Sequence, residues 1–113
     1  MSRTLQSLLE DARDALSRAG LTELDWTRAQ VSAARRTRSG LIVGDLSWFS
    51  QRVRFVCVNR SLDYLLAQRG VSWQPGLSAV FAIRLVIHRR HGFQAEVHDL
   101  DLDSVRCRPG GGL

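Results

Sequence analysis

The order of its hydrophobic segments is the feature that most restricts how this chain can fold. One short helical segment, residues 61–69, is followed by Gly70, a residue suited to ending a helix. This segment has three strand-like segments before it and two after it. The five have the period and composition of strands and are separated by turn-forming residues: 30–37, 41–48, 53–58, 77–88 and 93–102.

A helix between the third and fourth strands is typical of the OB fold, a closed five-stranded barrel with the order β-β-β-α-β-β. We therefore expect a mainly β protein of this class. In OB folds the second and third strands, together with the first-to-second and fourth-to-fifth loops, form the usual ligand face. Secretion-chaperone-like folds share much of this order, but they usually end in a further helix, and this chain ends in the glycine-rich stretch 109–112.

An amphipathic helix is predicted over residues 4–19, ahead of the barrel. Its apolar residues recur every three or four positions: Leu5, Leu8, Leu9, Ala12, Leu16 and Ala19. Charged residues on the other face favour a helix that lies on the barrel surface. We accordingly expect a helix packed on the barrel in residues 1–24, the OB-fold domain in 25–104 and a flexible tail in 105–113.

Charged residues also interrupt the first 25 positions, which argues against a signal peptide or a membrane span there. The two cysteines, Cys57 and Cys107, lie fifty positions apart without a C-x-x-C spacing, so neither a disulfide scaffold nor a zinc ribbon is indicated. We expect a cytoplasmic protein with no membrane partner.

All sixteen basic residues are arginine, and the formal net charge is +5. Residues 28–91 hold eleven arginines against two acidic residues, Asp45 and Asp63. Positive charge gathered in the middle of a domain indicates a partner with many negative charges, nucleic acid first and an anionic membrane second. The simpler alternative is a basic surface that serves only solubility.

Two arginine clusters fall in the loops that flank the ligand face of an OB barrel. The first-to-second loop carries Arg35, Arg36 and Arg38, and the fourth-to-fifth loop carries Arg89, Arg90 and His91. A planar guanidinium can hold a phosphate through two donors and can also stack on a base. Four further arginines are expected to extend this surface, two on the third strand and two beyond it: Arg52, Arg54, Arg60 and Arg84.

Aromatic side chains supply the second part of a single-strand site, because unpaired bases stack on them. Trp48, at the end of the second strand, is the best candidate for an exposed platform, and Phe93 is a further candidate. We expect Trp26, Phe55 and Phe81 in the core and Trp73 over one end of the barrel.

Enzymatic chemistry finds little support in the sequence. His88, His91 and His98 match no familiar metal-site spacing, and no nucleophile elbow, Walker motif or dinucleotide-binding glycine pattern occurs. We expect no catalytic residue, metal or cofactor.

Several segments together resemble the N-terminal OB-fold domain of the large subunit of exodeoxyribonuclease VII. They are Trp26–Ser32, Ser39–Val43, Val53–Val58, Ile83–Arg90 and Gly92-Phe93-Gln94. Where that family has Gly-Glu in its first strand, this chain has Ala29-Gln30, and the family's nuclease region has no counterpart in it. The resemblance implies single-stranded DNA binding, in DNA repair, without cleavage.

We therefore expect a module that holds single-stranded DNA largely without sequence specificity. One alternative is a protein-interaction or homodimerisation module that uses the N-terminal helix. Another is single-stranded RNA binding by the same face, since stacking and phosphate contacts do not read the sugar.

Overall fold

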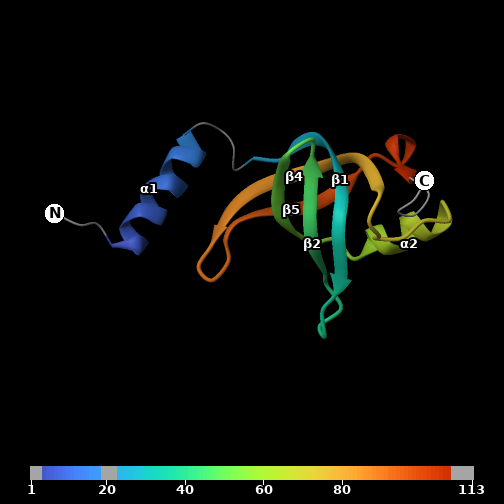
Figure 1. Ribbon diagram of the computed structural model, residues 1–113, viewed down its shortest axis with the longest axis horizontal. Coiled ribbons are helices and arrows are strands. Elements are labelled where there is room, and N and C mark those ends of the chain that lie inside the picture. The colour runs from blue at the N-terminus through green and yellow to red at the C-terminus, as the bar shows by residue number, and fades with distance from the viewer. Residues whose placement is uncertain (1–3, 19–22, 108–113) are drawn as a thin grey trace.

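Five strands close into a barrel in the computed structural model, which describes residues 4–18 and 23–107 (Figure 1). The strand order is β1-β2-β3-β5-β4, and β1 also pairs with β4 to complete the ring. A short sixth strand pairs with Leu77 and Ser78 at the start of β4. The elements are α1 (Leu5–Arg18), β1 (Asp25–Arg36), β2 (Ile42–Trp48), β3 (Gln51–Cys57), α2 (Ser61–Gln68), β4 (Leu77–His88), β5 (Gly92–Leu100), a 3-10 turn (Leu102–Ser104) and β6 (Arg106–Cys107).

Strand β1 makes closure possible because it pairs with two neighbours along its length. Residues 25–30 pair with β4, and residues 30–36 pair with β2. A bulge between Val31 and Ala33 bends the strand where it passes from one partner to the other. Gly44 of β2 lies opposite this bulge, and a Cβ there would lie 1.9 Å from the carbonyl oxygen of Ala33. The bend therefore requires glycine at position 44.

The other pairings complete the mixed barrel. β3 and β5 run parallel, whereas β1–β2, β1–β4, β2–β3 and β4–β5 are antiparallel. The expected OB-like architecture, a mainly β protein with five strands, one helix between β3 and β4 and one helix before the barrel, is confirmed.

Alternation along the strands fills the barrel with apolar side chains. Val31, Leu46, Phe55, Phe81 and Val97 are completely or almost completely buried. The expectation that Phe55 and Phe81 belong to the core is therefore confirmed.

Helix α2 and Trp73 close one end of the barrel. Leu62 and Leu66 of α2 are fully buried, and the ring of Trp73 lies 5.6 Å from that of Phe55 and 6.0 Å from that of Phe81. Trp73 thus covers the barrel end, as expected. The opposite end of the barrel is lined by a cavity that a ligand can enter.

Two local expectations were wrong. Trp26 is 59% exposed, because the inward positions of β1 are Ala29 and Val31 and alternation turns Trp26 outward. Residues 106 and 107, expected in a flexible tail, form β6: Cys107 lies opposite Leu77 and Arg106 opposite Ser78. The rest of that expected tail, 108–113, lies outside the described residues.

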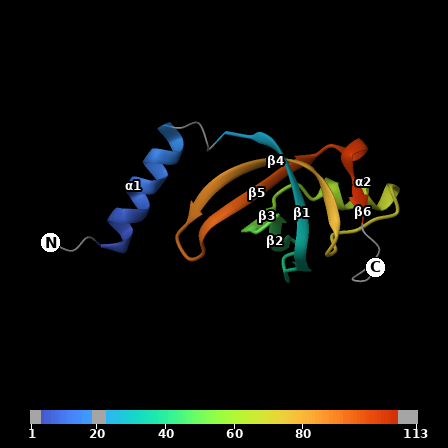
Figure 2. The same ribbon diagram turned by 45° about the horizontal axis from the view of Figure 1, so that its top comes forward.

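Helix α1 lies against the arm formed by β4 and β5, as Figures 1 and 2 show. Arg13 donates to the carbonyl oxygen of Ile87 at 2.9 Å, and Leu9 and Leu16 are half-buried. Leu5 and Leu8 remain 71% and 50% exposed. The apolar stripe is therefore only partly covered by this chain. Ala19, the last position expected in the helix, lies outside the described residues.

Candidate functional site

The outer face of β2 and β3 carries two arginines with free side chains. On β3, Val53 and Phe55 turn inward, so Arg52 and Arg54 point outward, as the alternation predicts. The strand register sets Arg54 opposite Asp45 and Arg52 opposite Ser47. Within the described part of the chain, neither guanidinium has an ion pair or hydrogen bond.

Arg35 shares a surface depression with Arg54. This depression has a volume of about 320 Å³, and Val43 and Asp45 of β2 lie between the two arginines. Two guanidinium groups thus flank one carboxylate, which leaves the depression positive. Since neighbouring strands lie about 4.8 Å apart, the surface from β1 to β5 extends for about 14 Å.

The turn between β4 and β5 brings His91 to the same side. The pKa of His91 is lowered by partial desolvation and then by the positive charges of Arg54, with smaller effects from His88 and Arg90. β3 and β5 run parallel with Phe55 opposite Ala95, which sets Arg54 beside the first residues of β5, directly after this turn. The rings of His88 and His91 stack at 4.8 Å, and the backbone N–H of Arg90 donates to Nδ1 of His88 at 3.1 Å, which orders the turn. We call Arg35, Arg52, Arg54, Arg90 and His91 the basic face.

Figures 1 and 2 agree on the arrangement around this face. In both figures the β4–β5 turn lies at the tip of the β4–β5 arm, towards α1, and the β1–β2 turn lies beyond the ends of β1 and β2. The strand register places the two turns at opposite ends of β3, with the β4–β5 turn beside its start and the β1–β2 turn beside its end.

The other predicted arginines do not all join the basic face. Arg38 is exposed in the β1–β2 turn, and Arg89 lines a separate depression between β4 and α1, where Glu10 and Arg13 also lie. The fourth-to-fifth cluster is thus divided, with His91 towards β3 and Arg89 towards α1.

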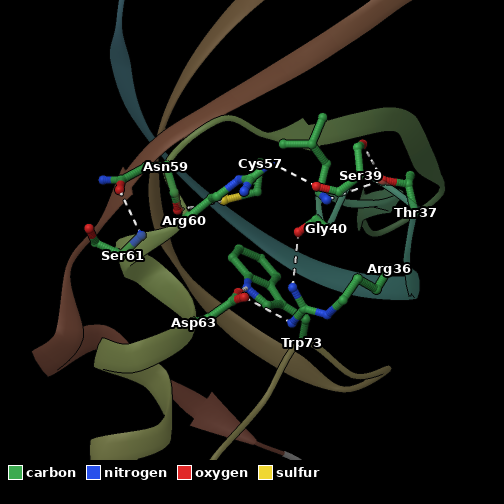
Figure 3. Close-up of polar contacts among 11 residues, drawn as sticks. Arg36, Thr37, Ser39, Gly40, Cys57, Asn59, Arg60, Ser61, Asp63 and Trp73 are labelled. Atoms are coloured by element: carbon green, nitrogen blue, oxygen red, sulfur yellow. Dashed lines mark hydrogen bonds and ion pairs between the residues drawn. The ribbon is translucent and has the colours of Figure 1, made fainter.

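Arg36 and Arg60 hold the β1–β2 turn against the end of the barrel that α2 closes, as Figure 3 shows. Arg36 donates to the carbonyl oxygen of Gly40 at 3.0 Å, and its Nη2 lies 2.8 Å from Oδ2 of Asp63 in α2. The other carboxylate oxygen of Asp63 accepts from Trp73 Nε1 at 2.9 Å. Arg60 donates to the carbonyl oxygen of Ser39 at 2.7 Å. These two arginines therefore support the turn.

Arg84 also forms an ion pair within the barrel. It lies opposite Glu96 on β5, and its Nε and Nη2 both donate to Oε1 of Glu96, which His98 Nε2 approaches at 3.1 Å. Burial alone would raise the pKa of Glu96, but the hydrogen bonds and charges of Arg84 and His98 together lower it below its ordinary value. Arg84 is thus neutralised by its neighbour.

The barrel end opposite α2 opens into an apolar cavity of about 490 Å³, which we call the barrel mouth. Its walls include Leu46, Val53, Ile83, Leu85 and Ala95. Apolar walls in a cavity of this size are typical of sites for small or planar ligands.

The rim of the barrel mouth combines aromatic and charged side chains. Trp48 and Phe93, 43% and 50% exposed, line it from the ends of β2 and β5. Arg28 and Arg52 also line it, as do the acidic residues Glu23 and Asp25. Arg52 thus belongs both to the basic face and to the barrel mouth, so the two surfaces are continuous.

Two site residues were missed in the sequence. Arg28 lies within the basic central segment, but alternation from Ala29 turns it outward, so the sequence held no signal that would place it on the rim. Phe49 is 90% exposed in the β2–β3 turn, its ring 5.2 Å from that of Trp48. Phe49 also has φ of 56°, which is uncommon for a bulky residue. The pair of consecutive aromatics at a reversal was the available signal.

The described residues contain no group of three or more His, Cys, Asp or Glu side chains arranged to hold a metal ion. Neither described helix combines the length and apolar character needed to cross a membrane.

No protein-family model matches the chain, and no curated protein is significantly similar to it.

Proposed function

We propose that this barrel binds single-stranded nucleic acid, DNA in preference to RNA, largely without sequence specificity. The strand lies across the outer face of β2 and β3, with its phosphates on the basic face. Bases at the barrel mouth stack on Trp48 and Phe93.

The observation that carries this proposal is the combination of unpaired arginines with exposed aromatics on adjoining surfaces. Arg35, Arg52 and Arg54 have no ionic partner among the described residues, although Asp45 lies nearby. Trp48 and Phe93 are each about half exposed at the end of the barrel that Arg52 also lines. A positively charged groove beside stacking platforms is the arrangement by which OB folds hold single strands.

The choice of DNA rests on the resemblance to the exodeoxyribonuclease VII domain, whose matched segments include β3 and the β4–β5 turn. The role proposed for this barrel is binding of the strand. The module would serve alone or as an accessory of a larger DNA-repair assembly.

Fluorescence anisotropy with a labelled oligo-dT of about 16 nucleotides tests the proposal. We expect binding at low salt, with log K falling by about 0.7 for each neutralised phosphate as log salt rises. Arg54→Glu should weaken binding and make this slope shallower. Arg106→Glu, which changes the net charge equally in β6, is the matched control. Absence of binding at low salt, or equal losses in both variants, would reject the proposed surface.

A second function is favoured by one observation, the exposure of Leu5 and Leu8 on α1. An uncovered apolar stripe on an amphipathic helix suits a protein partner or a second copy of the chain. A dimer that Leu8→Glu dissociates, in a protein that does not bind DNA, would favour this alternative.

The anisotropy titration also distinguishes RNA from DNA, when the affinity for oligo-dT is compared with that for an oligo-rU of the same length.

A further inference from the structure

The barrel mouth contains more than a stacking surface requires. A platform for unpaired bases needs only exposed rings, whereas here the rings stand over a cavity of about 490 Å³ with apolar walls. That volume lies within the range of small-ligand pockets, about 300–1,000 Å³. The volume and the apolar walls suit a planar, partly apolar group such as one nucleobase.

The carboxylates of the rim narrow the choice of base. Asp25, on the first residue of β1, lines the cavity and is exposed, and among the described residues its side chain has no ion pair. An ionised carboxylate only accepts hydrogen bonds. It therefore favours a base edge that presents N–H donors and disfavours one that presents carbonyl oxygens.

Guanine is the base that meets this condition best. Its N1–H and N2–H₂ groups are adjacent donors on the Watson–Crick edge, so both oxygens of one carboxylate can accept from it. Thymine places carbonyl oxygens on either side of its single N–H. Adenine and cytosine each offer one amino group beside a ring nitrogen acceptor.

Positive charge at the rim compensates the negative charge of Asp25, so a nucleic-acid strand can bind beside this carboxylate. Arg28 and Arg52 line the same cavity as Asp25. Their positive charges can neutralise phosphates next to an inserted base. Arg52 also lies two residues before Arg54 on the outward side of β3. A strand on the basic face can therefore turn one base into the mouth without leaving its arginine contacts.

We propose that the barrel mouth holds one guanine of the bound strand, with the edge of the base on the Asp25 carboxylate and its plane against Trp48 or Phe93. This inference rests on the proposed function, and it makes a sequence-tolerant surface selective at a single position. Asp25 is then a specificity-determining residue, whereas Arg54 contributes to the affinity for every strand.

The test compares a labelled oligo-dT with the same oligonucleotide carrying one central guanine, adenine or cytosine. We expect the guanine-containing strand to bind about 5-fold more tightly or better, the effect of one good carboxylate–base pair. Asp25→Asn should abolish this preference, so that the four strands bind the variant with affinities within about 2-fold of one another. Asp14→Asn, an equal charge change on α1, should keep the preference. Thermal unfolding checks that each variant folds.

A second variant covers the case in which Asp25→Asn does not fold. Phe93→Ala removes a rim platform without altering charge and should also reduce the guanine preference. Equal affinity for all four strands would overturn the guanine pocket and leave the proposed function standing. A preference that survives Asp25→Asn would likewise overturn the assignment. If wild-type protein binds none of the strands, the proposed function fails and the pocket fails with it.

Discussion

Arg36 at the end of β1 lies 2.8 Å from the carboxylate of Asp63 in α2. This arginine of the first hairpin therefore stabilises the closed end of the barrel. Because Asp63 also accepts from Trp73, the same carboxylate joins the hairpin, the helix and the aromatic cover of the core. The arginine cluster of the first-to-second loop therefore includes one residue that supports the fold and others that remain exposed on the surface.

Replacing Arg36 with glutamine should lower the stability of the fold. The two side chains are 53% and 32% exposed, so solvent weakens the pair and we expect a loss of roughly 0.5–1 kcal/mol. Urea unfolding measures it. Arg38→Gln, in the same turn and without an ionic partner in the described chain, should change stability by less than about 0.5 kcal/mol. Equal losses would show that the Arg36–Asp63 pair has no structural role.

Position 44 should tolerate no side chain. Alanine there would bring a Cβ to 1.9 Å from the Ala33 carbonyl oxygen, and relieving that overlap must move β1 against β2. We expect Gly44→Ala to cost about 2–3 kcal/mol or more, measured by urea unfolding. The control is Gly70→Ala, where φ is +72° but no atom lies within 4 Å of the added Cβ. Its cost should be about 1 kcal/mol, from backbone strain alone.

We expect the protein to be less stable with Phe49 than with a residue that tolerates the positive φ at this position. Asparagine tolerates positive φ better than phenylalanine, and the exposed ring of Phe49 buries little surface. We expect Phe49→Asn to raise the free energy of unfolding by about 0.5–1 kcal/mol and to weaken oligo-dT binding. Phe93→Asn, where φ is not positive, should bring no such gain. If Phe49→Asn is less stable than wild type, the positive φ of Phe49 is not a source of backbone strain.

The lowered pKa of Glu96 predicts a defined pH dependence. The unfolded chain binds a proton to this carboxyl near its ordinary value of about 4.5, whereas the folded protein binds it only at lower pH. The stabilisation is therefore fully present above pH 4.5 and is lost as the pH falls through the folded pKa. Unfolding measured over this range should show a shallower acid loss for Glu96→Gln than for wild type. Glu10→Gln, on exposed α1, should retain the wild-type slope.

Local sequence rules found every strand of the barrel because its segments are strongly patterned, but the first strand was expected over 30–37, whereas β1 is Asp25–Arg36. The missed segment carries most of the pairing with β4 that closes the barrel. Strand β4 has the bounds expected from its alternating apolar residues, and the short helix before Gly70 lies where its capping glycine placed it. Strand β6 could not be foreseen, because two residues carry no period and become a strand only by pairing with Leu77 and Ser78.

The site was less predictable, because the role of an arginine depends on partners that are distant in sequence. Arg52 and Arg54 were placed correctly by alternation alone. Arg36, Arg60 and Arg84 look equivalent to them in the sequence, yet their partners, Asp63, Ser39 and Glu96, become neighbours only when the barrel closes. The barrel mouth likewise needs side chains from all five strands of the barrel and is not encoded in any one segment.

The central claim is that a single strand lies across the outer face of β2 and β3, and NMR amide shift mapping during an oligo-dT titration tests it most directly. We expect the shifted amides to cluster on residues 43–47, 51–55 and 89–93, with those of α2 and β6 unchanged. Shifts centred on α2 or β6, or none at low salt, would contradict it.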